Sequence, residues 1–267
     1  MTRLDYLTAP KNKWVYLIPN LLTSVNIFFG VFAMISAFNA EYGMAAVAIL
    51  IAGVMDNVDG KIARMTKTTS RFGGEYDSLS DLVSFGVAPG LLIYAWSVNA
   101  YGRLGWVAVC LYIACGALRL ARYNVQGDGT EHADFVGLPI PAAASFIATS
   151  VILDNYILHF GREIRPIFIL VITFVLAFLM VSRIRYRSPK NIHFRTRSLG
   201  WILFASIVFA IFKSPQVVPF LIVVLYILSG LIERPLVALY CRYYRAERKS
   251  GGRGDEEKEK KFLLGHP

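Results

Sequence analysis

The chain has 267 residues, of which 55% are hydrophobic and only 17% are charged, and its mean hydropathy is +0.50. This balance excludes an ordinary soluble globular domain and indicates a protein that crosses a membrane several times. The net charge of +10 does not indicate nucleic acid as a partner, because the basic residues flank apolar segments and therefore suit membrane lipids with anionic head groups.

Apolar segments long enough to cross a bilayer recur along the chain, and they are too long for the strands of a membrane barrel. We predict an all-α integral membrane protein, a polytopic bundle of about eight transmembrane helices. The predicted spans are 17–38, 43–65, 77–98, 104–124, 137–155, 164–182, 198–213 and 217–239. The chain is expected to divide into an N-terminal segment 1–16, a membrane domain 17–240 and a charged, disordered tail 241–267.

The distribution of Lys and Arg predicts how the spans are oriented. Basic residues gather before the first span, between the second and third, between the sixth and seventh, and after the eighth. Because loops rich in Lys and Arg stay on the cytoplasmic side, both termini are expected there. The protein is expected in the inner or plasma membrane of the cell, with the loop between the second and third spans facing the cytoplasm.

Four aspartates flank that loop, in segments otherwise apolar enough to enter the membrane. Asp56 and Asp59 are three residues apart, and Asp77 and Asp81 are four apart, so each pair lies on one face of its helix. An ionised carboxylate at such a depth costs about 2.5–3.5 kcal/mol, which predicts bound cations. Carboxylates without His or Cys favour Mg²⁺ or Mn²⁺, one or two ions, over zinc. The alternative is a set of ion pairs with neighbouring Lys and Arg residues.

Residues beside the acids suit a diphosphate. Gly60 destabilises a helix by about 1 kcal/mol relative to Ala. A glycine at this position therefore indicates that a ligand or another backbone approaches closely there. Arg64 can bind phosphate oxygens bidentately, and Ser70 adds a donor in the connecting segment. The chain is then expected to turn at Gly73-Gly74 before the third span begins.

These residues fill a longer pattern, D-x2-D-G-x2-A-R-x8-G-x3-D-x3-D, which resembles the signature of the CDP-alcohol phosphatidyltransferase family. Its fixed positions are Asp56, Asp59, Gly60, Ala63, Arg64, Gly73, Asp77 and Asp81. The resemblance implies a membrane enzyme in which a hydroxyl displaces CMP from a CDP-linked substrate with the help of two divalent ions. It implies that all four aspartates are metal ligands and that Asp81 is also the general base.

The resemblance also implies which residues contact the CDP-lipid. They are Gly60, Arg64, Ser70, Gly73 and, in an upstream element similar to the family's Asn-x-x-Thr, Asn20 and Thr23. Capping of the first helix is the alternative role of the upstream pair.

Three further segments, 80–90, 116–124 and 137–144, resemble the phosphatidylserine synthase branch of this family. The branch implies CDP-diacylglycerol and L-serine as substrates and a homodimer as the assembly. Arg119 and Arg122 lie three apart on one helix face, where an intramembrane cation requires an anionic partner such as the serine carboxylate or a lipid phosphate. Their alternative role is to extend to the membrane interface.

Two other functions are compatible with the sequence. The first keeps the chemistry but uses another acceptor, namely glycerol 3-phosphate, inositol phosphate or choline. The second is a cation transporter that uses the acidic residues as a permeation site. Against the transporter stand the position of the acids near one membrane face and the lack of an internal repeat.

Overall fold

The computed structural model describes residues 14–65, 71–126, 135–158, 164–182, 184–186 and 213–231. Within these ranges the regular secondary structure is helical apart from one pair of two-residue strands. The elements are α1 (Trp14–Phe38), α2 (Tyr42–Met65), α3 (Arg71–Asp81), α4 (Ala88–Trp96), α5 (Arg103–Gln126), β1 (Phe135–Val136), α6 (Ile140–Leu153), α7 (Ile164–Val181) and β2 (Arg185–Tyr186). Two π-helices, Leu82–Val87 and Asp154–Leu158, and one 3₁₀ helix, Val98–Tyr101, connect them. A further helix runs over Val218–Leu231.

Five helical segments in the described ranges are long and apolar enough to cross a membrane. They are Pro19–Phe38, Tyr42–Ile62, Phe72–Trp96, Arg103–Val125 and Ile140–Ile157, and two shorter apolar helices, Arg165–Val181 and Val218–Leu231, follow them. These segments correspond to predicted spans one to six and to part of the eighth. Of the predicted span 198–213, only the last position is among the described residues. The segment 1–13 and the tail 241–267 lie entirely outside them.

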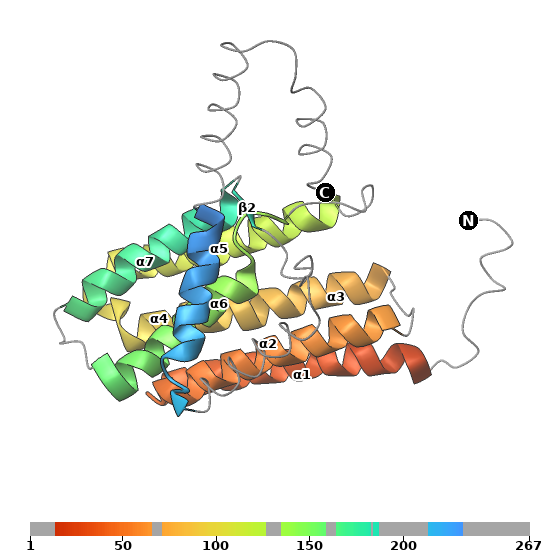
Figure 1. The fold of residues 1–267 in the computed structure, drawn as a ribbon, viewed down its shortest axis with the longest axis horizontal. Helices are drawn as coiled ribbons and strands as arrows, with labels where there is room; N and C mark the ends of the chain where they lie inside the picture. Colours follow the sequence, from red (N-terminus) through yellow and green to blue (C-terminus); the bar gives the residue numbers. More distant parts are fainter. Residues whose placement is uncertain are drawn as a thin grey trace, which may run out of the picture.

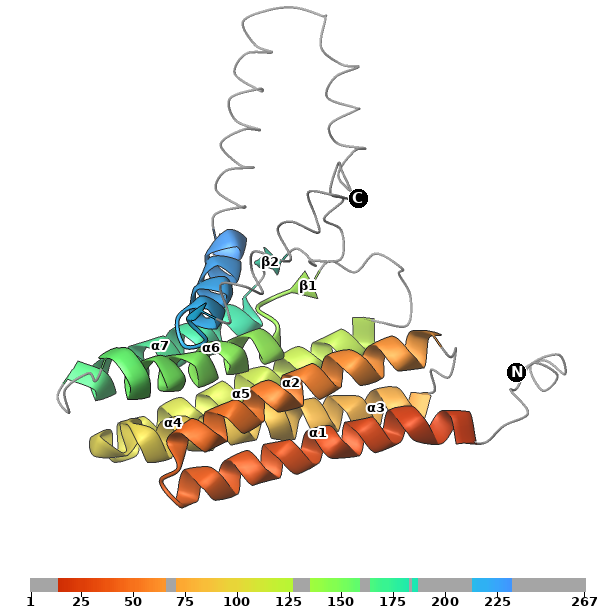
Figure 2. The same ribbon diagram turned by 60° about the horizontal axis from the view of Figure 1, so that its bottom comes forward.

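The helices α1 to α7 lie roughly along one direction, and the helix Val218–Leu231, blue in Figure 1, crosses them steeply (Figures 1 and 2). Small side chains line the helix contacts, including the fully buried Ala33, Ala45, Ala52 and Ala88. Lipid tails are as apolar as the core, so helices in a membrane associate mainly by close packing, which small residues permit. The bundle is held together in this way, with Leu, Phe and Met side chains exposed on its outer surface.

A tight turn joins α1 to α2 and makes them antiparallel neighbours. Ala40 has a positive φ of 61°. The amide of Ala40 donates to Ala37 O at 3.2 Å and that of Glu41 to Ser36 O at 2.9 Å. This pair of bonds is the Schellman motif, which satisfies the last carbonyls of a helix and reverses the chain. The turn therefore fixes the register between α1 and α2.

The third span is one continuous helical segment with a wider turn in its middle. The chain passes from α3 into the π-helix Leu82–Val87 and then into α4. Gly73 and Gly74 lie inside α3, so the predicted turn at these glycines is wrong; the helix begins at Arg71, six residues before the predicted start of the span. Glycine lowers helix propensity by about 1 kcal/mol, but packing of the rest of the segment outweighs that cost.

Segments far apart in sequence meet beside α7. Phe135 pairs with Tyr186 and Val136 with Arg185 in an antiparallel register. Gly137, with a φ of +91°, donates its amide to Ile184 O at 2.7 Å, and a Cβ at this position would lie 2.2 Å from Met180 O. Only glycine fits this turn, which secures the start of α6 against the end of α7.

Candidate metal and phosphate site

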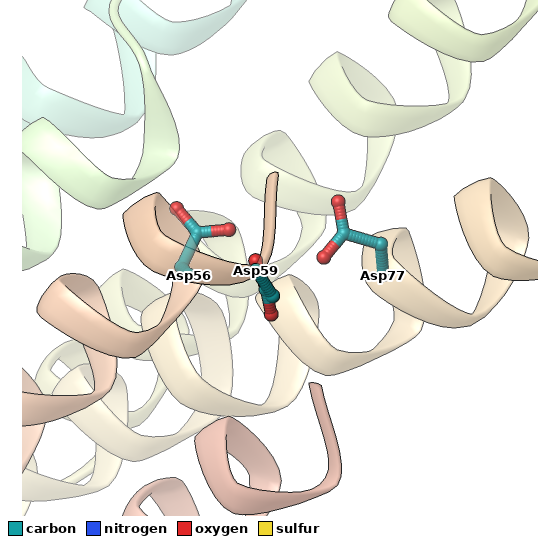
Figure 3. A group of neighbouring side chains, drawn as sticks. All are labelled: Asp56, Asp59 and Asp77. Carbon is teal, nitrogen blue, oxygen red and sulfur yellow. The ribbon is translucent and has the colours of Figure 1, made fainter. Parts of the chain in front are cut away.

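The acidic residues of α2 and α3 converge between these two helices, both of which pack against α1. One carboxylate oxygen from each of Asp56, Asp59 and Asp77 lies within 4.8 Å of the others. Figure 3 shows the Asp59 side chain between those of Asp56 and Asp77. Asp81, one turn after Asp77, has its carboxyl within hydrogen-bond range of that of Asp56. The structure thus brings together the four acids that the sequence predicted as ligands.

Several oxygens of this cluster lack partners. Asp59 is 3% exposed, and Oδ1 of Asp59, Asp77 and Asp81 is buried without a hydrogen bond among the described residues. Asp154 has an ion pair, with Arg165 at 3.0 Å, but no such pair to Asp59, Asp77 or Asp81 occurs within the described ranges. Lys61 is exposed. Buried anionic oxygens without a partner suit hard divalent cations, so the residues present fit Mg²⁺ or Mn²⁺.

Helix α1 supplies polar contacts to the cluster. The Thr23 hydroxyl lies 3.2 Å from Asp59 Oδ2 and 3.1 Å from Pro19 O, so its proton can be donated to the carboxylate. Ser80 on α3 donates to Thr23 O at 3.2 Å. Thr23 was predicted from a resemblance to contact the CDP-lipid; its place here is beside a predicted metal ligand. Asn20, one turn earlier, is partly buried, and its carbonyl accepts from Ser24 at 2.9 Å.

The predicted phosphate-binding residues are described only in part. Gly60 lies in α2 directly after Asp59, and Gly73 lies in α3 one turn before Asp77. Arg64 is the penultimate residue of α2, and only its backbone is described. The Arg64 side chain and the whole of Ser70 lie outside the described part of the structure. Both glycines therefore border the acidic cluster, as a close approach of diphosphate to the backbone would require.

The two arginines of α5 have different surroundings. Arg122 donates to Val181 O, the last carbonyl of α7, at 3.3 Å. Arg119 is 8% exposed, and its Nε has no hydrogen-bond partner among the described residues. Its guanidinium lies near Asp81 and near Tyr226, which belongs to the crossing helix Val218–Leu231. Arg119 is therefore available to an anionic ligand, while Arg122 stabilises the end of α7.

Sequence reasoning missed two contributors to this region. Tyr226 lies near Arg119 but is 107 residues later in the chain, and no local pattern indicates the pairing. Asn124 connects α5 to α3: its Nδ2 lies 3.1 Å from Ser78 Oγ and 3.2 Å from Glu75 Oε2. An Asn at the end of a membrane helix indicates a polar partner, but its identity depends on the packing.

Comparisons with known proteins agree with this geometry. The model of the family described as CDP-alcohol phosphatidyltransferase matches residues 16–181. The CDP-diacylglycerol–serine O-phosphatidyltransferase of Helicobacter pylori is 38% identical over 196 residues, covering 73% of this chain and 82% of that protein. The archaetidylserine synthase of Methanothermobacter thermautotrophicus is 36% identical over 171 residues, covering 63% and 69%. The CDP-diacylglycerol–serine O-phosphatidyltransferase of Mycobacterium tuberculosis is 41% identical over 133 residues, covering 48% of this chain and 46% of that protein.

Proposed function

The chain belongs to the CDP-alcohol phosphatidyltransferase family, a family of phosphotransferases, and we propose that it transfers the phosphatidyl group of CDP-diacylglycerol to the hydroxyl of L-serine. The products would be phosphatidylserine and CMP. The observation that carries this proposal is the convergence of Asp56, Asp59 and Asp77 within 4.8 Å, beside Asp81, which in turn has the buried Arg119 as a neighbour. Together these residues can hold cations, a diphosphate and the carboxylate of an acceptor in one place.

Divalent ions held by the four aspartates would neutralise the charge that develops on the diphosphate. The chain's own residues then have separate roles. Gly60 and Gly73 leave room for the diphosphate beside the backbone, and Thr23 orients Asp59 by donating to its Oδ2. Arg64 and Ser70 are proposed to bind phosphate oxygens and Asn20 the nucleotide, as the family resemblance implies.

Asp81 is the proposed general base. The serine oxygen attacks the phosphorus that carries diacylglycerol, the bond from that phosphorus to the oxygen of CMP breaks, and Asp81 accepts the hydroxyl proton. Direct attack needs no covalent enzyme intermediate and is the simpler route. Because water in place of serine would give phosphatidic acid, the reaction also requires an acceptor pocket that excludes water.

Serine as the acceptor is supported from two directions. The relatives named above differ in the lipid part of their names, diacylglycerol in one and archaetidyl in the other, but both names contain serine. In the structure, Arg119 is a buried cation near Asp81, where it can pair with the serine carboxylate while the serine hydroxyl reaches the base. Arg122 is engaged by Val181 O, so Arg119 carries most of the proposed acceptor binding.

We propose the remaining features as part of the same enzyme. The acidic cluster faces the cytoplasm, both termini are cytoplasmic, about eight helices cross the inner or plasma membrane, and the protein assembles as a homodimer. These proposals are supported by the Lys and Arg distribution and by the family resemblance. Labelling of single introduced cysteines at positions 2 and 260 with a membrane-impermeant maleimide, before and after lysis, tests the placement of the termini.

An acceptor panel tests the function. Purified protein with CDP-diacylglycerol is given L-serine, glycerol 3-phosphate, inositol 1-phosphate or choline, with Mg²⁺, with Mn²⁺ or with EDTA, and CMP release is measured. We expect CMP release that depends on serine and on a divalent ion. Absence of serine-dependent turnover would refute the proposed acceptor, and cation uptake into proteoliposomes without any CMP production would favour a transporter.

A further inference from the structure

One polar side chain in the middle of α1 has no role in the function proposed above. Asn26 is fully buried, and neither its Nδ2 nor its Oδ1 has a hydrogen-bond partner among the described residues. Its backbone is satisfied, since Asn26 O accepts from Ser84 Oγ at 3.0 Å. A buried carboxamide without partners is costly, and such groups in native structures are rare and are explained by strain, a functional role, or a bound water or ion. The side chain of Asn26 therefore requires an explanation.

The register between α1 and α2 places Asn26 beside the acidic cluster. Thr23 on α1 contacts Asp59 on α2 at 3.2 Å, and the two helices are antiparallel. Asn26 lies three residues after Thr23, and Asp56 lies three residues before Asp59, so each stays on the face of its helix that makes this contact. Both steps move about 4.5 Å in the same direction along the pair. Asn26 is thus level with Asp56, as Thr23 is with Asp59.

The third span closes the other side of Asn26. Ser80 donates to Thr23 O and Ser84 donates to Asn26 O, at 3.2 and 3.0 Å, so the chain on either side of Asp81 lies against the same stretch of α1. The two segments are in contact one turn further, where a Cβ on Gly30 would lie 2.5 Å from Ser84 Oγ. The stretch of α1 around Asn26 therefore faces both the helix that carries Asp56 and the segment that carries Asp81, and the Asn26 side chain is fully buried there.

We propose that Asn26 is a positioning residue of the cation site, with Nδ2 donating a hydrogen bond to the Asp56 carboxylate when the cluster binds a divalent ion. This inference rests on the cation site of the proposed function. A carboxylate ligand uses one oxygen for the ion, and a donor to its other oxygen fixes its orientation. Thr23 supplies that donor to Asp59. An amide can do so for Asp56 without adding a positive charge that would oppose the ion, and Oδ1 remains to accept from an ordered water.

The test compares Asn26→Leu with a matched control, Ser36→Ala, which changes another buried polar residue of α1 far from the cluster. Both variants, the wild type and Asp77→Asn are purified in nanodiscs and titrated with Mn²⁺, with free Mn²⁺ measured by electron paramagnetic resonance. We expect Asn26→Leu to weaken Mn²⁺ binding by about 10–100-fold, the usual effect of losing such a partner, and Ser36→Ala to leave it unchanged. Thermal stability in EDTA should not fall, since Leu replaces an unpartnered amide of similar size.

A second readout separates positioning from packing. We expect kcat to fall in Asn26→Leu while the KM for serine stays within about twofold, because the acceptor does not contact Asn26. If Asn26→Leu is not monodisperse, Asn26→Ala removes the same donor without adding volume, with the same expected loss. Unchanged Mn²⁺ affinity in the folded variant would overturn the inference. Absence of Mn²⁺ binding in the wild type would instead refute the cation site itself, so the two failures are distinguishable.

Discussion

Replacing Asp77 by Asn should have opposite effects on stability and on cation binding. Asp77 lies within 4.8 Å of carboxylate oxygens of both Asp56 and Asp59. Two full charges at that separation repel by about 3.5 kcal/mol at an effective dielectric constant of 20. Partial protonation reduces this repulsion, but even about 1 kcal/mol of relief would raise Tm by about 2–4 °C in a protein of this size. The variant should therefore be more stable than the wild type in EDTA.

In the presence of divalent ions the order should reverse. The wild type gains stability from ions bound to the folded state, by about 2.7 kcal/mol at a concentration one hundred times the dissociation constant. Asp77→Asn loses a ligand and with it most of that gain. Turnover should fall at least about a hundredfold, since several kcal/mol of charge stabilisation are removed and each 1.36 kcal/mol corresponds to a factor of ten.

The assay is thermal unfolding in detergent with EDTA, Mg²⁺ or Mn²⁺, together with CMP release. Glu41→Gln is the matched control, because Glu41 is an exposed acid in the turn between α1 and α2. It removes the same charge away from the cluster and should change neither the EDTA value nor the increment given by the ions. A variant Asp77→Asn that loses stability in EDTA, or that keeps the full increment, would show that the three carboxylates do not form a cation site.

Three further predictions address the base, the acceptor site and the contact between α3 and α5. Asp81→Asn should lower kcat by about 10²–10⁴-fold, the usual contribution of a general base, and leave the elution volume in size exclusion unchanged. Arg119→Ala should raise the KM for serine at least tenfold. Arg122→Ala should instead leave this KM within about twofold. It should lower the free energy of unfolding by about 1.5–3 kcal/mol, because it breaks a charged hydrogen bond to the end of α7. Asn124→Ala removes the contacts to Ser78 and Glu75, so its kcat should be below that of the wild type. Asn124→Ser retains a hydrogen-bond donor, and its kcat should lie between those of Asn124→Ala and the wild type.

Each of these has an outcome that contradicts it. More than a tenth of wild-type turnover in Asp81→Asn would remove that residue as the base. Equal effects of the two arginine variants on the KM for serine would mean that the structure does not separate their roles. An Asn124→Ala enzyme with wild-type kcat would show that α3 holds Asp77 and Asp81 in place without its contact to α5.

Prediction from the sequence was strongest for local features. The helices α1, α2, α5 and α7 begin and end within a few residues of the predicted spans, because the length of an apolar run determines whether it can cross a membrane. The pairing of acids on helix faces followed from spacings of three and four residues. The start of the third span was wrong by six residues, since two adjacent glycines indicated a turn, whereas they belong to a helix that packs against α1 further along its length.

Contacts across the bundle could not be predicted from the residues that make them. Thr23 and Asp59 are 36 positions apart, and Arg119 and Tyr226 lie 107 apart. Nothing in the sequence separates Arg119 from Arg122, which share one helix face. The packing of α7 decides that Arg122 meets a backbone carbonyl, while Arg119 lies toward Asp81.

The sequence by itself determined that this is a helical membrane protein with four acids in two facing pairs, because hydropathy and helical periodicity are properties of neighbouring residues. It also determined the family, through a pattern of fixed spacing. Only the tertiary structure decided that three of these acids converge within 4.8 Å, that Thr23 contacts one of them, and that Asn26 lies buried at the same level. Those facts depend on the register between helices, which the turn at Ala40 and the close contact at Gly30 set by steric fit rather than by composition.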